Sequence, residues 1–361
     1  MTIYLLNFLT IPIYTVCIAR FGSKTHKRAM ALLCFQMFLI MALRSTAIGS
    51  DIPNYAKYYA HWAGYSFREM VVSTRFLVNQ RIAWGLESGY VWFNWLCAKL
   101  GCSFHTFLVI HAAVCMLGLY VFLTRHTDAP ALVLAIFVSF GAWSSFFYIL
   151  RQSLVFIVAI WAFRYAVERK PWKYLLVCCL AILFHRAALV LLPLYLVGRI
   201  RINRKIIVLF AVATVICPLI LPTMNHLYRS FLALVGKGGM YHMNMQYALN
   251  NMTICMAILF AVMLVFSDHY SIFDDPKINL SGWFFMAAIL LEELSPYVPE
   301  VSRIPLYCLF PFGAIALSSA IERLSTEKRV LVKANCYVVL FGFYIFVIRG
   351  SSIVPYIPVW N

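Results

Sequence analysis

Acidic residues, and charge of either sign, are scarce in this chain. Only 13 of its 361 residues are Asp or Glu, and charged residues together make up 12%, whereas soluble domains have about a quarter. Hydrophobic residues make up 63%, and the mean hydropathy is +0.83. Apolar runs broken by short basic loops extend from residue 2 to residue 348. The sequence therefore predicts an all-α, polytopic integral membrane protein, a single transmembrane domain over 1–361 with about 10–12 transmembrane helices.

Patterns that hold metals, disulfides or nucleotides are also missing. The 11 cysteines form no Cys-x-x-Cys pair, and the acids form no Asp-x-Asp pattern. The cysteines thus indicate apolar helix residues, and we expect no metal site and no cofactor. The stretch GKGGM (236–240) lacks the remaining residues of a phosphate-binding loop. The N-terminal run has no leading basic region or small-residue cleavage site, so we expect it to be a first span.

The net charge of +17 is concentrated in four basic clusters between apolar runs. They are Arg20, Lys24, Lys27 and Arg28; Arg164, Arg169, Lys170 and Lys173; Arg199, Arg201, Arg204 and Lys205; and Arg323, Lys328, Arg329 and Lys333. The positive-inside rule predicts that such clusters lie in the cytoplasm. A nucleic-acid surface would instead need them on one continuous face, so we expect no nucleic-acid partner.

With the clusters inside, the chain follows a consistent path across the membrane. The expected spans are 2–19, 29–43, 103–123, 130–148, 151–168, 206–222, 251–267, 280–292, 304–321 and 334–348. The expected outer, periplasmic segments are 44–102, 223–250 and 293–303. This path leaves the run 174–198 between two cytoplasmic clusters, although its 25 residues are too few for two full helices of about 20 residues each.

A hairpin of two short helices over 174–198 would resolve this conflict, with His185 and Arg186 at its tip. Non-helical backbone at membrane depth is tolerated inside protein or beside a water-filled cavity, so the pair would face a polar cavity open to the outer side. The alternative is one ordinary span in which Arg186 pairs with a carboxylate of a neighbouring helix.

Arginine dominates the basic residues on the expected outer side. Nine of these 12 residues are arginine, and Arg44, Arg151, Arg186 and Arg303 each lie at the outer end of an apolar run. The planar guanidinium binds phosphate oxygens through two hydrogen bonds and stays charged when partly buried. The surplus therefore indicates an anionic partner, although some of these arginines will contact lipid headgroups.

The outer segment 44–102 is rich in aromatic residues. Its stretch GLESGYVWFNWLCAKLG predicts an amphipathic periplasmic helix over 85–101, which begins near Glu87 and carries Tyr90. The preceding stretch GSDIPNYAKYYAHW contains Asp51 and Tyr55 among several aromatics. Aromatic faces with phenol hydroxyls are typical of sugar sites, and an aromatic belt at the membrane interface gives the same composition.

Four stretches in this order resemble the EpsG family of bacterial membrane proteins, which belongs with the Wzy-type polymerases of O-antigen and exopolysaccharide. They are GSDIPNY, LESGYVWFNWLCAKLG, LRQSLVFIVAI and LAILFHRAALVLLPL. The resemblance covers residues 44–200 well and continues in SRIPLYCLF (302–310). The family often has Pro before the Gly of the glutamate motif, where this chain has Ser88.

The resemblance implies a glycosyltransferase of the bacterial inner membrane, and the lack of an Asp-x-Asp pattern predicts that arginines replace a metal ion. The enzyme would transfer the growing glycan from undecaprenyl diphosphate to the next lipid-linked repeat at the periplasmic face, with a chain-length regulator as a candidate partner protein. The candidate general bases are Glu87, His185 and Asp51. The candidate diphosphate and sugar ligands are Arg151, Gln152, Arg186, Arg303, Arg44, Tyr55, Tyr90 and Tyr307.

Three other classes remain open at this point. A solute-coupled transporter would also place charges at depth, but it would usually show inverted repeats, and the two halves of this chain do not match. A flippase for lipid-linked oligosaccharides would need a similar cationic cavity, open to either face. A membrane acyltransferase would need a catalytic His, which His185 could supply.

Overall fold

The computed structural model describes residues 1–19, 23–76, 86–220, 251–266, 270–295, 304 and 309–360. These residues form helices, and among them the only extended pairing is an isolated bridge between Arg44 and Pro358. The predicted all-helical class is therefore confirmed. The chain divides into two compact units, one comprising Met1–Pro193 with Val330–Asn361 and the other Leu194–Arg329.

Three helices in the described part of the chain are long and apolar enough to cross a membrane. They are α6 (Phe104–His126), α9 (Leu150–Val167) and α17 (Thr326–Arg349). Several further apolar helices have 10–17 residues, fewer than the roughly 20 that span a bilayer at a modest tilt. The chain is a polytopic membrane protein in which long helices are combined with shorter ones.

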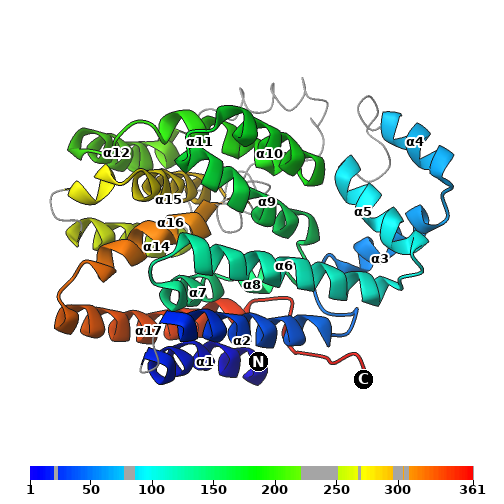
Figure 1. The fold of residues 1–361 in the computed structure, drawn as a ribbon, viewed down its shortest axis with the longest axis horizontal. Helices are drawn as coiled ribbons and strands as arrows, with labels where there is room; N and C mark the ends of the chain where they lie inside the picture. Colours follow the sequence, from blue (N-terminus) through cyan, green and yellow to red (C-terminus); the bar gives the residue numbers. More distant parts are fainter. Residues whose placement is uncertain are drawn as a thin grey trace. The chain divides into compact units, whose positions relative to one another are not determined.

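The first unit contains the N-terminal half of the chain and most of α17 (Figure 1). Its other helices are α1 (Thr2–Ala19), α2 (Ser23–Ala42), α3 (Ile52–Ala63), α4 (Phe67–Phe76), α5 (Ser88–Lys99), α7 (Pro130–Ser139), α8 (Ala142–Ser145) and α10 (Pro171–Phe184). The 3-10 helix η1 (Arg186–Val190) and the start of α11 (Leu191–Val197) follow. The short helices α3, α4 and α5 gather at one end of α6 (Figure 1).

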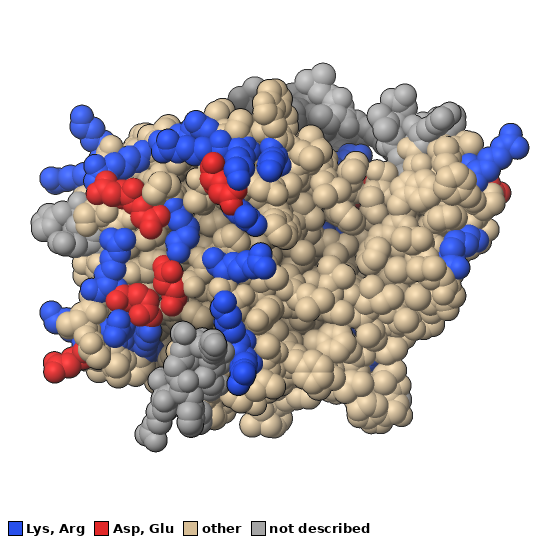
Figure 2. Space-filling model, in the orientation of Figure 1, with Lys and Arg blue, Asp and Glu red and all other residues tan. Residues whose placement is uncertain are grey.

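The second unit contains α12 (Arg204–Ile220), α14 (Asn251–Val265), η2 (Ser271–Asp274), α15 (Pro276–Leu294) and α16 (Phe310–Glu322). The buried amide of Asn279 fixes the turn before α12, because it accepts from the Ile202 N–H at 2.8 Å and donates to the carbonyls of Gly198 and Ile200. Basic side chains gather over α12 (Figure 2). This region includes the third cluster predicted to be cytoplasmic.

Local sequence signals explain where many of these helices begin. A proline occupies the first or second position of α3, α7, α10, α15 and α16, where its missing N–H costs no hydrogen bond and its fixed φ suits a helix. The Ser103 hydroxyl caps α6 by accepting a hydrogen bond from the Thr106 N–H at 3.1 Å. The Asp275 carboxylate likewise caps α15 by accepting from the Lys277 N–H. These caps satisfy backbone donors that the first helical turn leaves unpaired.

The prediction of one continuous span over 130–148 is wrong. Helix α7 ends at Ser139, and Gly141 adopts a left-handed conformation with φ of 78° before the four-residue helix α8. Glycine reaches this conformation without the steric cost that a Cβ would bring, so the backbone turns there. The hydroxyls of Ser144 and Ser145 then donate to the carbonyls of residues 141 and 142. The break places the first turn of α9 directly after a bend.

The predicted hairpin of two short helices over 174–198 is confirmed. Helix α10 ends at Phe184, His185 is extended, and η1 and α11 follow. The Tyr174 hydroxyl donates to the Leu191 carbonyl. These residues would lie about 25 Å apart along one straight helix, so the chain must turn back at His185 and Arg186.

The helix predicted over 85–101 is present as α5, which begins at Ser88. One face is buried through Tyr90, Val91, Asn94 and Cys97, which recur at helical spacing. The opposite face, in contrast, carries Leu96, which is 52% exposed. Helix α5 therefore packs on one side and presents an apolar surface on the other.

Candidate functional site

The first turn of α9 and the start of α5 meet through a short ion pair. The guanidinium of Arg151 donates from NH1 to Glu87 Oε2 at 2.6 Å, and its Nε donates to the Tyr55 hydroxyl at 3.4 Å. The side chains of Arg151 and Glu87 are 20% and 9% exposed, so the pair is largely withdrawn from solvent. A partly buried arginine of this kind combines fixed geometry with a permanent positive charge.

Glu87 also reaches the tip of the 174–198 hairpin. Its Oε1 accepts a hydrogen bond from the backbone N–H of Arg186 at 3.0 Å. Glu87 is the N-cap residue of α5, but its side chain makes no hydrogen bond to its own helix. Instead, the one carboxylate joins α5, α9 and the start of η1. The guanidinium of Arg186 is exposed, and among the described residues no ion pair includes it. The alternative in which Arg186 pairs with a neighbouring carboxylate therefore finds no support in this part of the chain.

His185 has hydrogen-bond contacts at both ring nitrogens. Nδ1 accepts from the Ala187 N–H at 3.0 Å, and Nε2 lies 3.2 Å from the side-chain amide of Gln152. Because Nδ1 accepts, the neutral ring carries its proton on Nε2 and needs an acceptor there. The amide orientation that satisfies both groups turns Gln152 Oε1, a buried acceptor without another partner, toward the ring. In this orientation the Nε2–H of His185 donates to Gln152 Oε1.

Aromatic rings pack beside the Arg151–Glu87 ion pair. Tyr55 is 5% exposed, and its ring meets that of Tyr90 edge-on at a centroid distance of 5.5 Å. Tyr90 is fully buried and packs in turn against Phe107 of α6. Tyr90 thus packs against the Tyr55 ring, and the Tyr55 hydroxyl accepts a hydrogen bond from Arg151.

A glycine allows α5 to approach α10 closely enough for this arrangement. A Cβ on Gly89 would lie 2.8 Å from the carbonyl oxygen of Leu183 and 3.0 Å from its Cβ. Leu183 is three residues before Arg186, so this contact brings Glu87 within reach of the hairpin tip. We call the six residues Tyr55, Glu87, Arg151, Gln152, His185 and Arg186 the arginine–glutamate cluster.

Substituting Gly89 with Ala is expected to destabilise the protein by about 1–3 kcal/mol, the usual cost of overpacking a tight contact, and to lower activity by separating Glu87 from Arg186. The control is Gly342→Ala in α17, where a Cβ would meet nothing within 4 Å. That change should be neutral or stabilising by up to about 1 kcal/mol. Thermal unfolding of the purified proteins in detergent checks both, and equal melting temperatures for the two variants would contradict the close-packing argument.

Asp51 and Arg44 were also predicted to be site residues. Asp51 is the N-cap residue of α3, and its carboxylate accepts from the Ser50 hydroxyl at 3.3 Å. Arg44 is 1% exposed and lies over the ring of Phe147 at 4.8 Å. No hydrogen bond from Nε or NH1 of Arg44 is found within the described residues. Arg303 and Tyr307, which the sequence also predicted as ligands, lie outside the described residues.

His111 was not among the predicted site residues, yet it fixes the first turn of α9. Its Nε2 lies 3.1 Å from the Leu150 carbonyl and 2.8 Å from the Ser153 hydroxyl, and the side chain is fully buried. The two residues that His111 contacts, Leu150 and Ser153, flank Arg151 and Gln152 in the sequence. The signal in the sequence was a single imidazole within the apolar run of α6, of the same kind as His185 in α10.

Within the described ranges, no group of three or more His, Cys, Asp or Glu side chains is placed to hold a metal ion. In the arginine–glutamate cluster, the charged groups available to a ligand are therefore the two arginines and Glu87.

Comparison with known proteins identifies the family of the chain. The model of the EpsG family matches residues 27–358, nearly the whole chain. The chain belongs to the EpsG family. EpsG proteins resemble Wzy-type polymerases, so membership indicates a polysaccharide polymerase-type function at a membrane. The match includes all six residues of the arginine–glutamate cluster. No curated protein and no solved structure matches the chain.

Proposed function

We propose that this protein polymerises a surface polysaccharide, either O-antigen or exopolysaccharide. It transfers the growing glycan from undecaprenyl diphosphate to the next lipid-linked repeat at the periplasmic face of the inner membrane. The observation that carries the proposal is the arginine–glutamate cluster, where Arg151 is fixed by Glu87 and Arg186 presents its guanidinium at a break between short helices. Broken helices at membrane depth are typical of sites for polar substrates.

The reaction breaks the bond between the anomeric carbon and the diphosphate oxygen, and it forms a bond from that carbon to an acceptor hydroxyl. Negative charge develops on the leaving diphosphate, which two guanidinium groups can stabilise through paired hydrogen bonds. We assign this role to Arg151 and Arg186. The Nε2–H of His185, which faces the Gln152 amide at 3.2 Å, would donate to a diphosphate or sugar oxygen that displaces this amide. The hydroxyl proton passes to a carboxylate, for which Glu87 is the candidate closest to Arg151 among the described residues.

The test is the surface polysaccharide of a strain that lacks this protein, examined by gel electrophoresis. Loss of the polymer ladder, with a single repeat still attached to its acceptor, is the result expected for a polymerase. Loss of the single repeat as well would contradict the proposal and support the flippase alternative. Complementation by the unmodified gene must restore the ladder.

The periplasmic placement leads to a prediction about labelling from outside. Ala60, on the exposed side of α3, and Asn203, just before α12, are both exposed positions. In a background without native cysteines, Ala60→Cys is expected to react with a membrane-impermeant maleimide in intact spheroplasts. Asn203→Cys and the control Lys170→Cys should react only after the membrane is permeabilised. Labelling of position 203 in intact spheroplasts would contradict the cytoplasmic placement of the third basic cluster, on which the prediction of the 174–198 hairpin depends.

The two nitrogens of His185 can be tested separately. Asn places its side-chain oxygen near the Nδ1 position and so preserves the hydrogen bond from the Ala187 N–H, whereas Gln places a donor near Nε2. If Nε2–H contacts the substrate, His185→Gln should retain more polymer than His185→Asn, with both proteins at normal amounts. A quantitative ladder assay checks this. The reverse order would assign His185 to the turn between α10 and η1 instead.

A further inference from the structure

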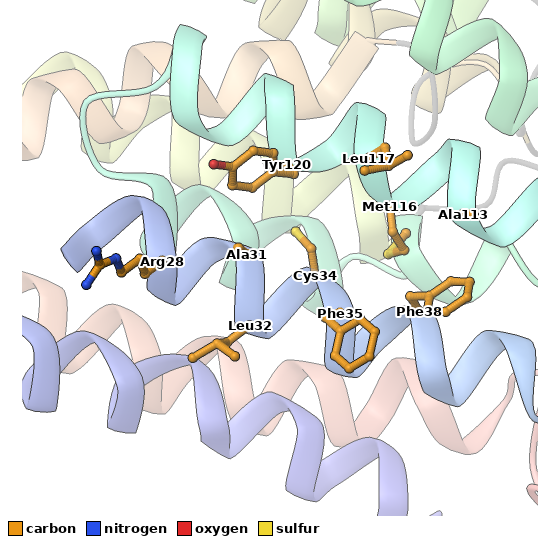
Figure 3. A pocket seen from close by; sticks show the side chains of 10 residues that line it. All are labelled: Arg28, Ala31, Leu32, Cys34, Phe35, Phe38, Ala113, Met116, Leu117 and Tyr120. Atoms are coloured by element: carbon orange, nitrogen blue, oxygen red, sulfur yellow. The ribbon is translucent and has the colours of Figure 1, made fainter. Parts of the chain in front are cut away.

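A groove between α2 and α6 has the features of a lipid site (Figure 3). We propose that it binds one anionic glycerophospholipid of the inner leaflet, with an acyl chain along the groove and the phosphate at the Arg28 end. This inference is independent of the proposed function, since it concerns a different part of the first unit and is tested by binding.

The groove is large and almost entirely apolar. Its volume is about 810 Å³, within the range of about 300–1,000 Å³ that ligand sites occupy. Its lining comes from these two helices alone, including Leu32, Phe35 and Phe38 of α2 and Leu117 of α6. Leu32, Phe35 and Leu117 are 53%, 56% and 66% exposed, so the groove opens sideways rather than into the protein. An open apolar groove in a membrane helix pair suits a hydrocarbon chain.

One end of the groove is polar and cationic. Arg28 and Tyr120 lie at this end in Figure 3, and the Tyr120 hydroxyl points toward the same side as Arg28. Lys27 precedes Arg28, and Arg125 follows in the last turn of α6. Neither helix contains an Asp or Glu, and among the described residues no ion pair includes these three cations. Guanidinium, ammonium and phenol groups at the end of an apolar groove are complementary to a phosphate headgroup.

The membrane orientation and the position along α6 specify which lipid would occupy the groove. Arg28 belongs to the first basic cluster, predicted to be cytoplasmic, where anionic lipids attract basic residues next to a membrane helix. Along α6, Tyr120 lies nine residues beyond His111, about 13 Å farther from the first turn of α9. The phosphate end is therefore remote from the residue of α6 that contacts Ser153 beside the arginine–glutamate cluster. An inner-leaflet phospholipid fits this end better than a substrate used on the opposite side.

The test measures lipid binding to the full-length protein in detergent by native mass spectrometry. The probes are dioleoyl phosphatidylglycerol and its zwitterionic analogue, dioleoyl phosphatidylcholine. The anionic lipid should bind at least about tenfold more tightly, since each nearby basic residue contributes about a fivefold preference. The double variant Lys27→Gln, Arg28→Gln should lose most of this preference, because Arg125 alone remains at this end of the groove. The matched control Lys57→Gln removes a cation from α3, outside the groove, and should retain it.

A second variant tests the groove itself. Ala113 lines the groove opposite Phe38, so Ala113→Trp should fill it and weaken binding of both lipids. Leu39→Trp, on the exposed side of α2 but outside the lining, should not. Equal binding of the two lipids by the unmodified protein would overturn the proposal, as would an undiminished preference in the double variant. Displacement of phosphatidylglycerol by equimolar undecaprenyl phosphate would assign the groove to a prenyl chain and would also overturn it.

Discussion

Polymerisation by an Arg151→Gln variant is expected to fall at least about a hundredfold, because a charge-assisted hydrogen bond contributes about 1.5–3 kcal/mol and more than one is lost. Arg151 contacts both Glu87 and Tyr55, so its removal also leaves a carboxylate that is 9% exposed without its cation. Breaking such a pair costs about 3 kcal/mol or more of stability. Both losses can be measured, one by the polymer ladder and the other by thermal unfolding.

A double-mutant cycle with Glu87→Gln separates these two effects. The Gln side chain still offers an oxygen to the Arg186 N–H but carries no charge. In the double variant neither charge is left unpaired, so stability should partly recover relative to Arg151→Gln alone. Polymerisation should not recover, because the guanidinium that binds the diphosphate and the carboxylate proposed as the base are both absent. Recovery of the ladder together with stability would contradict both of these roles and leave the pair with a structural role alone.

The Arg186→Ala variant is expected to accumulate normally in the membrane and to polymerise about 10- to 100-fold more slowly, the scale of one or two charge-assisted contacts. Arg186 meets Glu87 through its backbone N–H, which Ala retains, and its guanidinium is exposed. Arg186→Lys should be similarly impaired, because a compact ammonium cannot reproduce the two-point geometry. Ladder length and immunoblots of the membrane fraction provide the two measurements.

Arg68 provides the matched control for Arg186. It is an exposed arginine in α4 on the same expected side of the membrane and is not one of the six residues of the arginine–glutamate cluster. Arg68→Ala removes the same charge and should leave the ladder unchanged. Near-normal ladders from both Arg186→Lys and Arg151→Lys would contradict the proposed diphosphate site, which would then have to be sought around Arg44 and Arg303.

Much of the fold could be predicted because apolar length and charge placement are local properties of the sequence. The break at His185 followed from a count of 25 residues between two basic clusters, and the structure has it at that position. The break after Ser139 could not be predicted in this way, since the run 130–148 is mostly apolar, carries no charge and has a suitable length. Its cause is the left-handed conformation of Gly141, which the sequence allows but does not require.

The six residues of the arginine–glutamate cluster were among those expected from the sequence, but the contacts between them could not be predicted. Arg151 and Arg186 were expected at the same end of the bundle from topology alone, and both meet Glu87. That Glu87 pairs with Arg151 across 64 positions depends on the packing of α5, which Gly89 controls through its contact with Leu183. Such long-range contacts have no local signature. His111 was missed for the same reason, because its partners lie 39 and 42 positions away.

The two bonds of Glu87 also set an order of events during biosynthesis. Its partners lie 64 and 99 positions downstream. At a rate of synthesis of about 5–20 residues per second, the second partner is therefore made roughly 5–20 s after Glu87. During that interval α5 cannot dock in its final position, because Leu183 of α10 has not yet been made. The side of α5 that faces Leu183 must therefore stay uncovered until α10 has been made. We expect α5 to be more open to proteases in a ribosome-bound chain truncated before α10 than in one extended past α11.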